Sequence, residues 1–342
     1  MTYIKQLDGL RAFAVISVML FHLGIPFFSA GWLGVPLFFV LSGFLITGIL
    51  INNKDKPHRF KNFYIRRSLR IFPLYYFYIL VVFLFCTYLG VQDPNPWWWY
   101  LTYTQNYFYA INNFHYVSGQ ELGHTWSLAV EEQFYLLWPF VVLLCSRYIS
   151  VIAAIILCII SISLRYYLTT HTNIVAFSPL FSSMDMLLIG GLLAYSSLNY
   201  RLFKTLALLM LFIGSAWTFM IVKYDMFVFG GHYGITGPNQ SFYISSTVLF
   251  AGIIGVISSG VIKAEFLNFK PLNYLGKISY GLYIWHPFVN IVVDVVIYRG
   301  YFKFISGNYV IMTKIILTVA VASLSYHILE YPFLKLKDRF TK

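Results

Sequence analysis

The sequence predicts an all-α fold, a polytopic membrane bundle of about ten transmembrane helices with both termini in the cytoplasm. Hydrophobic residues make up 59% of the 342 positions, and charged residues make up only 11%. The mean hydropathy is +0.71, far above the range of soluble domains. Apolar runs long enough to cross a bilayer recur along the whole chain, so the hydrophobic residues do not belong to one water-soluble core.

Apolar runs separated by polar connections define the individual spans. The first run has Lys5 and Arg11 near its start, as a signal peptide would, but it lacks a small-residue cleavage site, so we expect it to be retained. The tail after Phe333 is too short for another domain, and we expect residues 1–342 to form a single transmembrane domain with no soluble C-terminal domain. The predicted spans are residues 9–27, 33–51, 71–89, 128–146, 149–168, 180–198, 203–222, 243–262, 277–298 and 308–330.

Basic residues predict the orientation of the bundle. Residues 91–127 contain no Lys or Arg, whereas residues 54–70 contain seven. Basic residues gather on cytoplasmic loops, so we place residues 54–70 and both termini on the cytoplasmic side of the inner (plasma) membrane. The same rule explains the net charge of +12 without nucleic-acid binding, which we do not expect. The seven are Lys54, Lys56, Arg59, Lys61, Arg66, Arg67 and Arg70.

The cysteines give no sign of a metal site. Cys86, Cys145 and Cys158 all lie in apolar runs, with none of the close spacings that metal-binding cysteines show. We interpret them as small hydrophobic residues and expect no bound metal.

Ionisable residues in the first span are the first candidates for chemistry. Arg11 and His22 are eleven residues apart, close to three helical turns, so they share one stripe with Asp8 and lie about 16 Å apart along the axis. A histidine can remove a proton from a hydroxyl near neutral pH, and a polar residue at this depth is costly. The alternative is that His22 is a structural hydrogen-bonding residue.

Arg67 and Arg70 lie at positions i and i+3 just before the third span. Two guanidinium groups at this spacing can bind phosphate, and the first span brings Arg11 to the same cytoplasmic side. The alternative is that these arginines only determine topology.

Two adjacent carboxylates, Glu131 and Glu132, enter the fourth span from the outer side. Acidic residues favour the first turn of a helix, which is one explanation. A buried carboxylate could also orient His22 and stabilise its imidazolium form. His286 in the ninth span should also lie near mid-membrane, and Asp185 in the sixth span is a weaker candidate that could only brace helices.

These residues together resemble acyltransferase family 3, a family of membrane acyltransferases that includes the O-acetyltransferases of bacterial surface polysaccharides. The resemblance covers nearly the whole chain. Its motifs are residues 7–12 (LDGLRA) leading to His22, residues 31–47 (GWLGVPLFFVLSGFLIT), Arg67 with Arg70, residues 125–139 (TWSLAVEEQFYLLWP), residues 278–287 (ISYGLYIWHP) and the closing Glu330, Tyr331 and Pro332.

The resemblance implies that His22 is catalytic and that Arg11, Arg67 and Arg70 bind an acyl-CoA donor, with acetyl-CoA as the expected donor. The acceptor would be a glycan or lipid-linked sugar, such as O-antigen or exopolysaccharide. One position departs from the family, because Ser183 stands where an arginine is expected, and some relatives carry a C-terminal hydrolase-like domain that we do not expect here. Residues expected to support the site or the acceptor are Asp8, His124, Trp126, Ser127, Tyr135, Tyr283 and His286.

These positions give a mechanistic hypothesis. Acyl-CoA docks its phosphates on the arginines, and His22, oriented by Glu131 or Glu132, takes the proton from an acceptor hydroxyl in a direct transfer. A two-step route through an acyl intermediate stays open, with Ser42 and Ser127 as the available nucleophiles. A secondary transporter with intramembrane His, Glu and Asp sites is the alternative function, although the sequence shows no related halves.

Overall fold

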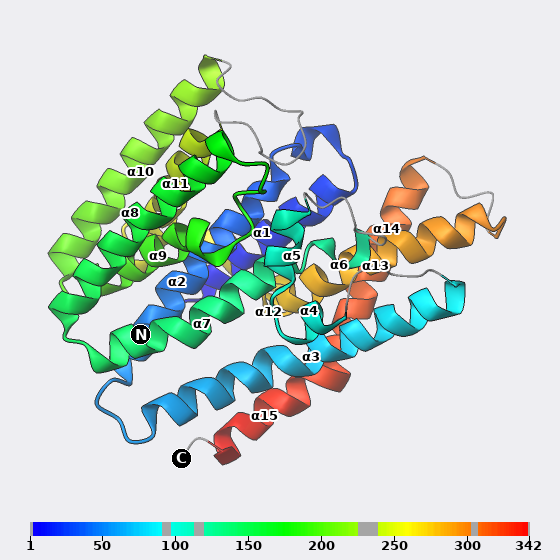
Figure 1. Cartoon of the computed structure of the whole chain (residues 1–342), viewed down its shortest axis with the longest axis horizontal. Helices are drawn as coiled ribbons and strands as arrows, with labels where there is room; N and C mark the ends of the chain where they lie inside the picture. Colours follow the sequence, from blue (N-terminus) through cyan, green and yellow to red (C-terminus); the bar gives the residue numbers. More distant parts are fainter. Residues whose placement is uncertain (1–2, 91–96, 113–119, 225–238, 302–306, 341–342) are drawn as a thin grey trace.

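A computed structural model shows the chain as a bundle of helices (Figure 1) and describes residues 3–90, 97–112, 120–224, 239–301 and 307–340. The described residues contain helices and turns but no strand, which confirms the predicted all-α class. The longer helices are α1 (Lys5–His22), α2 (Gly34–Asn52), α3 (Arg59–Leu89), α7 (Trp126–Leu144), α8 (Arg147–His171), α9 (Met184–Ser196), α10 (Tyr200–Lys223), α11 (Asn239–Ser258), α13 (Ser279–Tyr298), α14 (Asn308–Ser325) and α15 (Tyr331–Phe340). Shorter segments are η1 (Pro26–Phe28), η2 (Gly31–Leu33), α4 (Trp98–Leu101), α5 (Gln105–Ile111), α6 (Gln120–Gly123), η3 (Leu180–Ser182), η5 (Glu265–Asn268), α12 (Lys270–Lys277) and the π-helical turn η6 (Tyr326–Glu330).

Within the described residues, eight helices are long and apolar enough to cross a membrane. Two of the ten predicted spans are not among the eight. The first corresponds to α1, which carries three charged residues in its 18 positions, and the sixth corresponds to α9, which has only 13 residues. The count of about ten therefore stays a prediction, as does the cytoplasmic placement of the termini. Exposed isoleucines along the outside of α8 have the character of a lipid-facing surface. They are Ile152, Ile155, Ile156 and Ile159.

Two predicted boundaries were wrong. The first span was expected to reach residue 27, but α1 ends at His22, and Gly24 follows with a φ of +69°, a left-handed conformation that glycine adopts without strain. The third span was expected to begin near residue 71, but α3 already begins at Arg59. At 31 residues, α3 is about 46 Å long, so Arg67 and Arg70 lie on the same rigid helix that enters the membrane.

Close backbone contact joins α2 to α9 in the core. A Cβ atom added to Gly43 of α2 would lie 1.8 Å from the carbonyl oxygen of Leu187 on α9, and one added to Gly190 would lie 2.0 Å from the carbonyl oxygen of Val40. Glycine at both positions lets the two backbones approach, as small residues do between membrane helices.

The arrangement of the other helices positions α1 in the interior. α1 contacts α2, α12 and α13, while α3 lies beside α15 along one edge of the bundle (Figure 1). Nine residues of α1 are buried, including Asp8. Of the other residues singled out on this helix, Arg11 is half-buried and His22, at its end, is exposed.

Candidate active site

Three histidines from distant parts of the chain meet at one end of α1. Nε2 of His286 lies 3.2 Å from Nδ1 of His22, and the His124 ring packs at 5.4 Å from the His286 ring. The Tyr283 hydroxyl donates to the carbonyl oxygen of His124 at 3.0 Å and lies 2.7 Å from Oγ of Ser127. We call these five residues the histidine cluster. His286, His124, Ser127 and Tyr283 are buried, while His22 is exposed.

Arginines and glutamates meet at a second place. Arg67 is close enough to Arg11 and Arg70 for Coulombic repulsion, and it attracts Glu132. Glu131 is attracted to Arg67 and Arg11. Tyr135 lies beneath the Arg67 guanidinium, with 5.3 Å from Cζ to the ring centre, and completes what we call the arginine–glutamate cluster, namely Arg11, Arg67, Arg70, Glu131, Glu132 and Tyr135.

The charges in the arginine–glutamate cluster are only loosely paired. The ion pairs of the described residues include Arg11 with Asp8 at 3.1 Å, but none joins Arg67 or Arg70 to a glutamate. Arg67, Glu131 and Glu132 are half-buried, and Arg70 is exposed. An anionic ligand that neutralised the arginines would therefore find cations that are not already occupied.

Two helices that run in opposite directions connect the two clusters. α1 carries Arg11 in one cluster and His22, its last residue, in the other, about 16 Å apart along the axis. α7 runs the opposite way, with Ser127 in the histidine cluster and Tyr135 about 12 Å further along. Glu131 lies between them and is close enough to Tyr283 for a Coulombic interaction. The two clusters are therefore joined by α1 and α7, with Glu131 between them.

The predicted pairing of His22 with a glutamate is not what the structure shows. Nδ1 of His22 contacts the carbonyl oxygen of Val18 at 3.0 Å and the His286 ring, whereas Glu131 accepts a hydrogen bond from Ser42 at 2.5 Å. The reason is geometric: both glutamates lie one turn or more beyond Ser127 along α7, closer to the arginines than to the end of α1.

Two further predicted residues have other partners. Trp126 packs against Phe39 and Phe177, with ring centres 6.0 and 5.1 Å apart, so it belongs to the apolar core beside the site. Asp8 accepts from Arg11 and also from the hydroxyl of Tyr3. Asp8 thus holds Arg11 in place at the start of α1.

A buried ion pair explains the position where the sequence departs from the family. Asp185 is bonded by Arg165 of α8, with Nη1 to Oδ1 at 2.6 Å and Nη2 to Oδ2 at 2.8 Å, and both side chains are buried. Asp185 thus has its guanidinium partner on another helix, α8. Arg165 was missed in the sequence because a single arginine late in a predicted span gives no indication of its partner.

Glu330 is another buried carboxylate that sequence reasoning left without a role. It ends the π-helical turn η6, is 5% exposed, and lies within Coulombic range of Arg70. π-helical turns within helices are frequent at functional sites. The closing motif Glu-Tyr-Pro was the signal that could have placed it beside the arginine–glutamate cluster.

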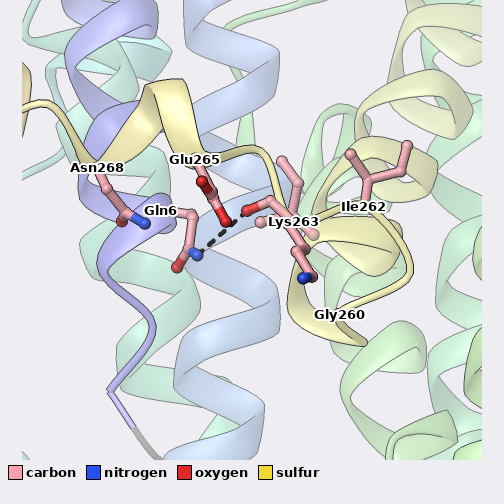
Figure 2. Close-up of a pocket in the computed structure, with 7 residues that line it drawn as sticks. Gln6, Gly260, Ile262, Lys263, Glu265 and Asn268 are labelled. Carbon is pink, nitrogen blue, oxygen red and sulfur yellow. Dashed lines mark hydrogen bonds between the residues drawn. The ribbon is translucent and has the colours of Figure 1, made fainter.

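Two pockets open near the cytoplasmic ends predicted for α1 and α3. One, of about 230 Å³, is lined by Lys56, Arg59 and Arg66, together with Asn53 and Asn62, directly beside Arg67 in sequence. The other is larger, about 540 Å³, and lies where α1 begins, with Gln6 donating to the carbonyl oxygen of Lys263 at 3.3 Å (Figure 2). Gln6 is about 24 Å along α1 from His22, so the larger pocket does not contain the histidine cluster.

The chain has clear relatives among known proteins. The model of the family described as "Acyltransferase domain" matches residues 4–327. "O-acetyltransferase OatA" of Staphylococcus aureus is 32% identical over 97% of this chain and 57% of its own length. "Peptidoglycan O-acetyltransferase OatA" of Listeria monocytogenes is 30% identical over 97% of this chain and 56% of its own length.

The chain thus spans a little over half the length of these curated relatives. Among solved structures, no significant match was found. The family match extends over nearly all of the chain, including both clusters and the motifs between residues 7 and 287, while the closing Glu330, Tyr331 and Pro332 lie just beyond the matched residues. We conclude that this chain belongs to the acyltransferase domain family of membrane proteins.

Proposed function

We propose that the chain is an integral membrane O-acetyltransferase of the plasma membrane that moves an acetyl group from cytosolic acetyl-CoA to a sugar hydroxyl of a cell-surface glycan. His22 acts as the general base. The observation that carries the proposal is that α1 carries a residue of each cluster, with Arg11 among the arginines and His22 in the histidine cluster about 16 Å away.

The arginines support a phosphorylated donor. Arg11, Arg67 and Arg70 form a cationic group in which no carboxylate is close enough to Arg67 or Arg70 for an ion pair. Guanidinium groups bind phosphate in bidentate fashion. The basic pocket beside Arg66 is suited to the nucleotide end of CoA, and the linear pantetheine arm would then extend along α1 towards His22.

The histidine cluster supports proton abstraction at the other end of this path. His22 is the last residue of α1, where the negative end of the helix dipole stabilises the imidazolium that forms when the ring takes a proton. The acceptor hydroxyl loses its proton to His22, its oxygen bonds to the thioester carbonyl carbon, and the carbon–sulfur bond breaks. The proton then passes from His22 to the departing thiolate.

The acceptor class is proposed from the relatives. The Listeria relative is named as a peptidoglycan enzyme, which favours peptidoglycan over O-antigen or exopolysaccharide as the glycan. The secondary-transporter alternative gains no support from the family or from these relatives.

The test is a transfer assay with the purified full chain in proteoliposomes. Acetyl-CoA carrying a labelled acetyl group is supplied with peptidoglycan fragments, and alkali-labile labelled ester is measured on the fragments. We expect wild type to form ester and His22→Ala to lose at least about 100-fold of the rate, since general base catalysis contributes on that order.

His171→Ala is the matched control, because His171 is exposed at the end of α8 and far in sequence from both clusters. It should retain the wild-type rate. If His22→Ala inserts at normal levels and still forms ester at the wild-type rate, the catalytic assignment of His22 is wrong.

A further inference from the structure

The buried ring of His286 has one nitrogen whose protonation state its surroundings determine. Nδ1 of His286 lies 2.8 Å from the carbonyl oxygen of Tyr283 and 3.2 Å from that of Leu282. Carbonyl oxygens can only accept hydrogen bonds, so Nδ1 must carry the proton. The side chain is 1% exposed, and within the described part of the chain the titratable rings that contact it are those of His22, His124 and Tyr283. A neutral ring therefore has its lone pair on Nε2.

That lone pair points at His22. Nε2 of His286 lies 3.2 Å from Nδ1 of His22, and the same Nδ1 lies 3.0 Å from the carbonyl oxygen of Val18. Both neighbours of this nitrogen are acceptors, so Nδ1 of His22 carries a proton and donates it. A neutral imidazole has only one N–H, which leaves Nε2 of His22 as the nitrogen that can take a proton.

We propose that His286 is a positioning residue that holds His22 with its proton on Nδ1, so that Nε2 of His22 is the proton acceptor in the transfer. The proposal rests on the proposed function, because it gives His22 the role of general base. His286 takes the place that the sequence had assigned to Glu131 or Glu132, with a neutral acceptor instead of a carboxylate.

The arrangement accounts for each proton. The acceptor hydroxyl gives its proton to Nε2 of His22, and its oxygen bonds to the thioester carbon. During this step His22 is an imidazolium, and its Nδ1–H donates to Nε2 of His286, which stabilises the charge without receiving the proton. As the carbon–sulfur bond breaks, the sulfur takes the proton from Nε2 of His22 and leaves as the CoA thiol.

Two substitutions at one position test the inference. His286→Phe keeps the ring volume but removes the acceptor, and we expect kcat to fall on the order of 10- to 100-fold, as with other partners that orient a catalytic ring, with KM for acetyl-CoA unchanged. His286→Gln places an amide oxygen near the position of Nε2 and should recover most of the lost kcat. The rate is followed as CoA thiol release from acetyl-CoA in the presence of peptidoglycan fragments.

A double variant separates positioning from general damage to the fold. In the His22→Ala background, His286→Phe should lower the residual rate no further, because its effect acts through His22. A further fall in that background, or no rescue by glutamine, would overturn the inference and leave His286 as a packing residue. His171→Gln is the control for the substitution itself.

The rates of His22→Ala and His286→Phe distinguish failure of this inference from failure of the proposed function. If His22→Ala is fully active, the general base is elsewhere and the proposed mechanism fails. If His22→Ala is inactive but His286→Phe keeps the wild-type kcat, the mechanism stands and only the role of His286 is refuted.

Discussion

The buried pair of Arg165 and Asp185 allows a prediction of stability with a magnitude. Arg165 makes three bonds, two to the Asp185 carboxylate and one from Nη1 to the carbonyl oxygen of Ser182 at 2.8 Å. Asp185 also accepts from the hydroxyl of Ser161 at 3.1 Å. Neither charge has access to water, since the side chains are 2% and 0% exposed.

Removing either charge leaves the other uncompensated in the bundle. Asp185→Asn preserves shape but leaves the guanidinium cation buried, and Arg165→Met leaves the carboxylate with one hydroxyl. We expect each single variant to lower the free energy of unfolding by about 3–5 kcal/mol. The double variant Arg165→Met with Asp185→Asn removes both charges, so its loss should be smaller than the sum of the singles by about 2–3 kcal/mol or more.

The measurement is unfolding of the full chain in mixed micelles with increasing denaturing detergent. The four proteins of the cycle are compared under one condition, and the coupling free energy is taken from the four midpoints and slopes. Two single variants as stable as wild type, or a double variant whose loss equals the sum of the singles, would refute the reasoning that this pair braces α8 against α9.

Two further predictions concern helix packing and donor binding. Gly43→Ala should lower the free energy of unfolding by at least about 1–3 kcal/mol in the same assay, because its Cβ would lie 1.8 Å from a backbone oxygen of α9; wild-type stability would contradict the close α2–α9 contact. Arg67→Ala combined with Arg70→Ala should raise KM for acetyl-CoA on the order of 10-fold or more, since each charge-assisted hydrogen bond is worth about 1.5–3 kcal/mol. Lys61→Ala, on the exposed side of the same basic run, should leave KM unchanged. If Lys61→Ala changes KM as much as the double arginine variant does, the basic run only determines topology.

The helices were the part of the fold that could be predicted from sequence. Apolar runs mark them because hydrophobicity is a local property of about 20 residues. Helix ends were less predictable: α3 extends back to Arg59 because basic residues are good helix formers, although they end an apolar run. α1 ends at His22, since Gly24 turns the chain before the apolar run is over.

The site was predicted as a set of residues but not as a set of pairs. Arg11 and His22 could be placed on one stripe because they share a helix. Which side chain would meet His22 depends on how α1, α7 and α13 pack, and His286 is 264 positions away along the chain. A carboxylate seemed the natural partner by analogy with triads, but the helical rise of α7 moves Glu131 towards the arginines.

The short helix α9 has a consequence for how the protein is made. At 13 residues it is about 20 Å long, too short to cross the hydrocarbon core of a bilayer by itself. Nearly all of its side chains are buried, and its neighbours are α2, α8, α10 and α11. During synthesis, α9 therefore cannot insert stably by itself. It requires packing against helices that precede it and follow it in the chain. The last of these neighbours is α11 (Asn239–Ser258), so the interior around α9 and around α2, which carries Ser42, is complete only after residue 258 has been translated.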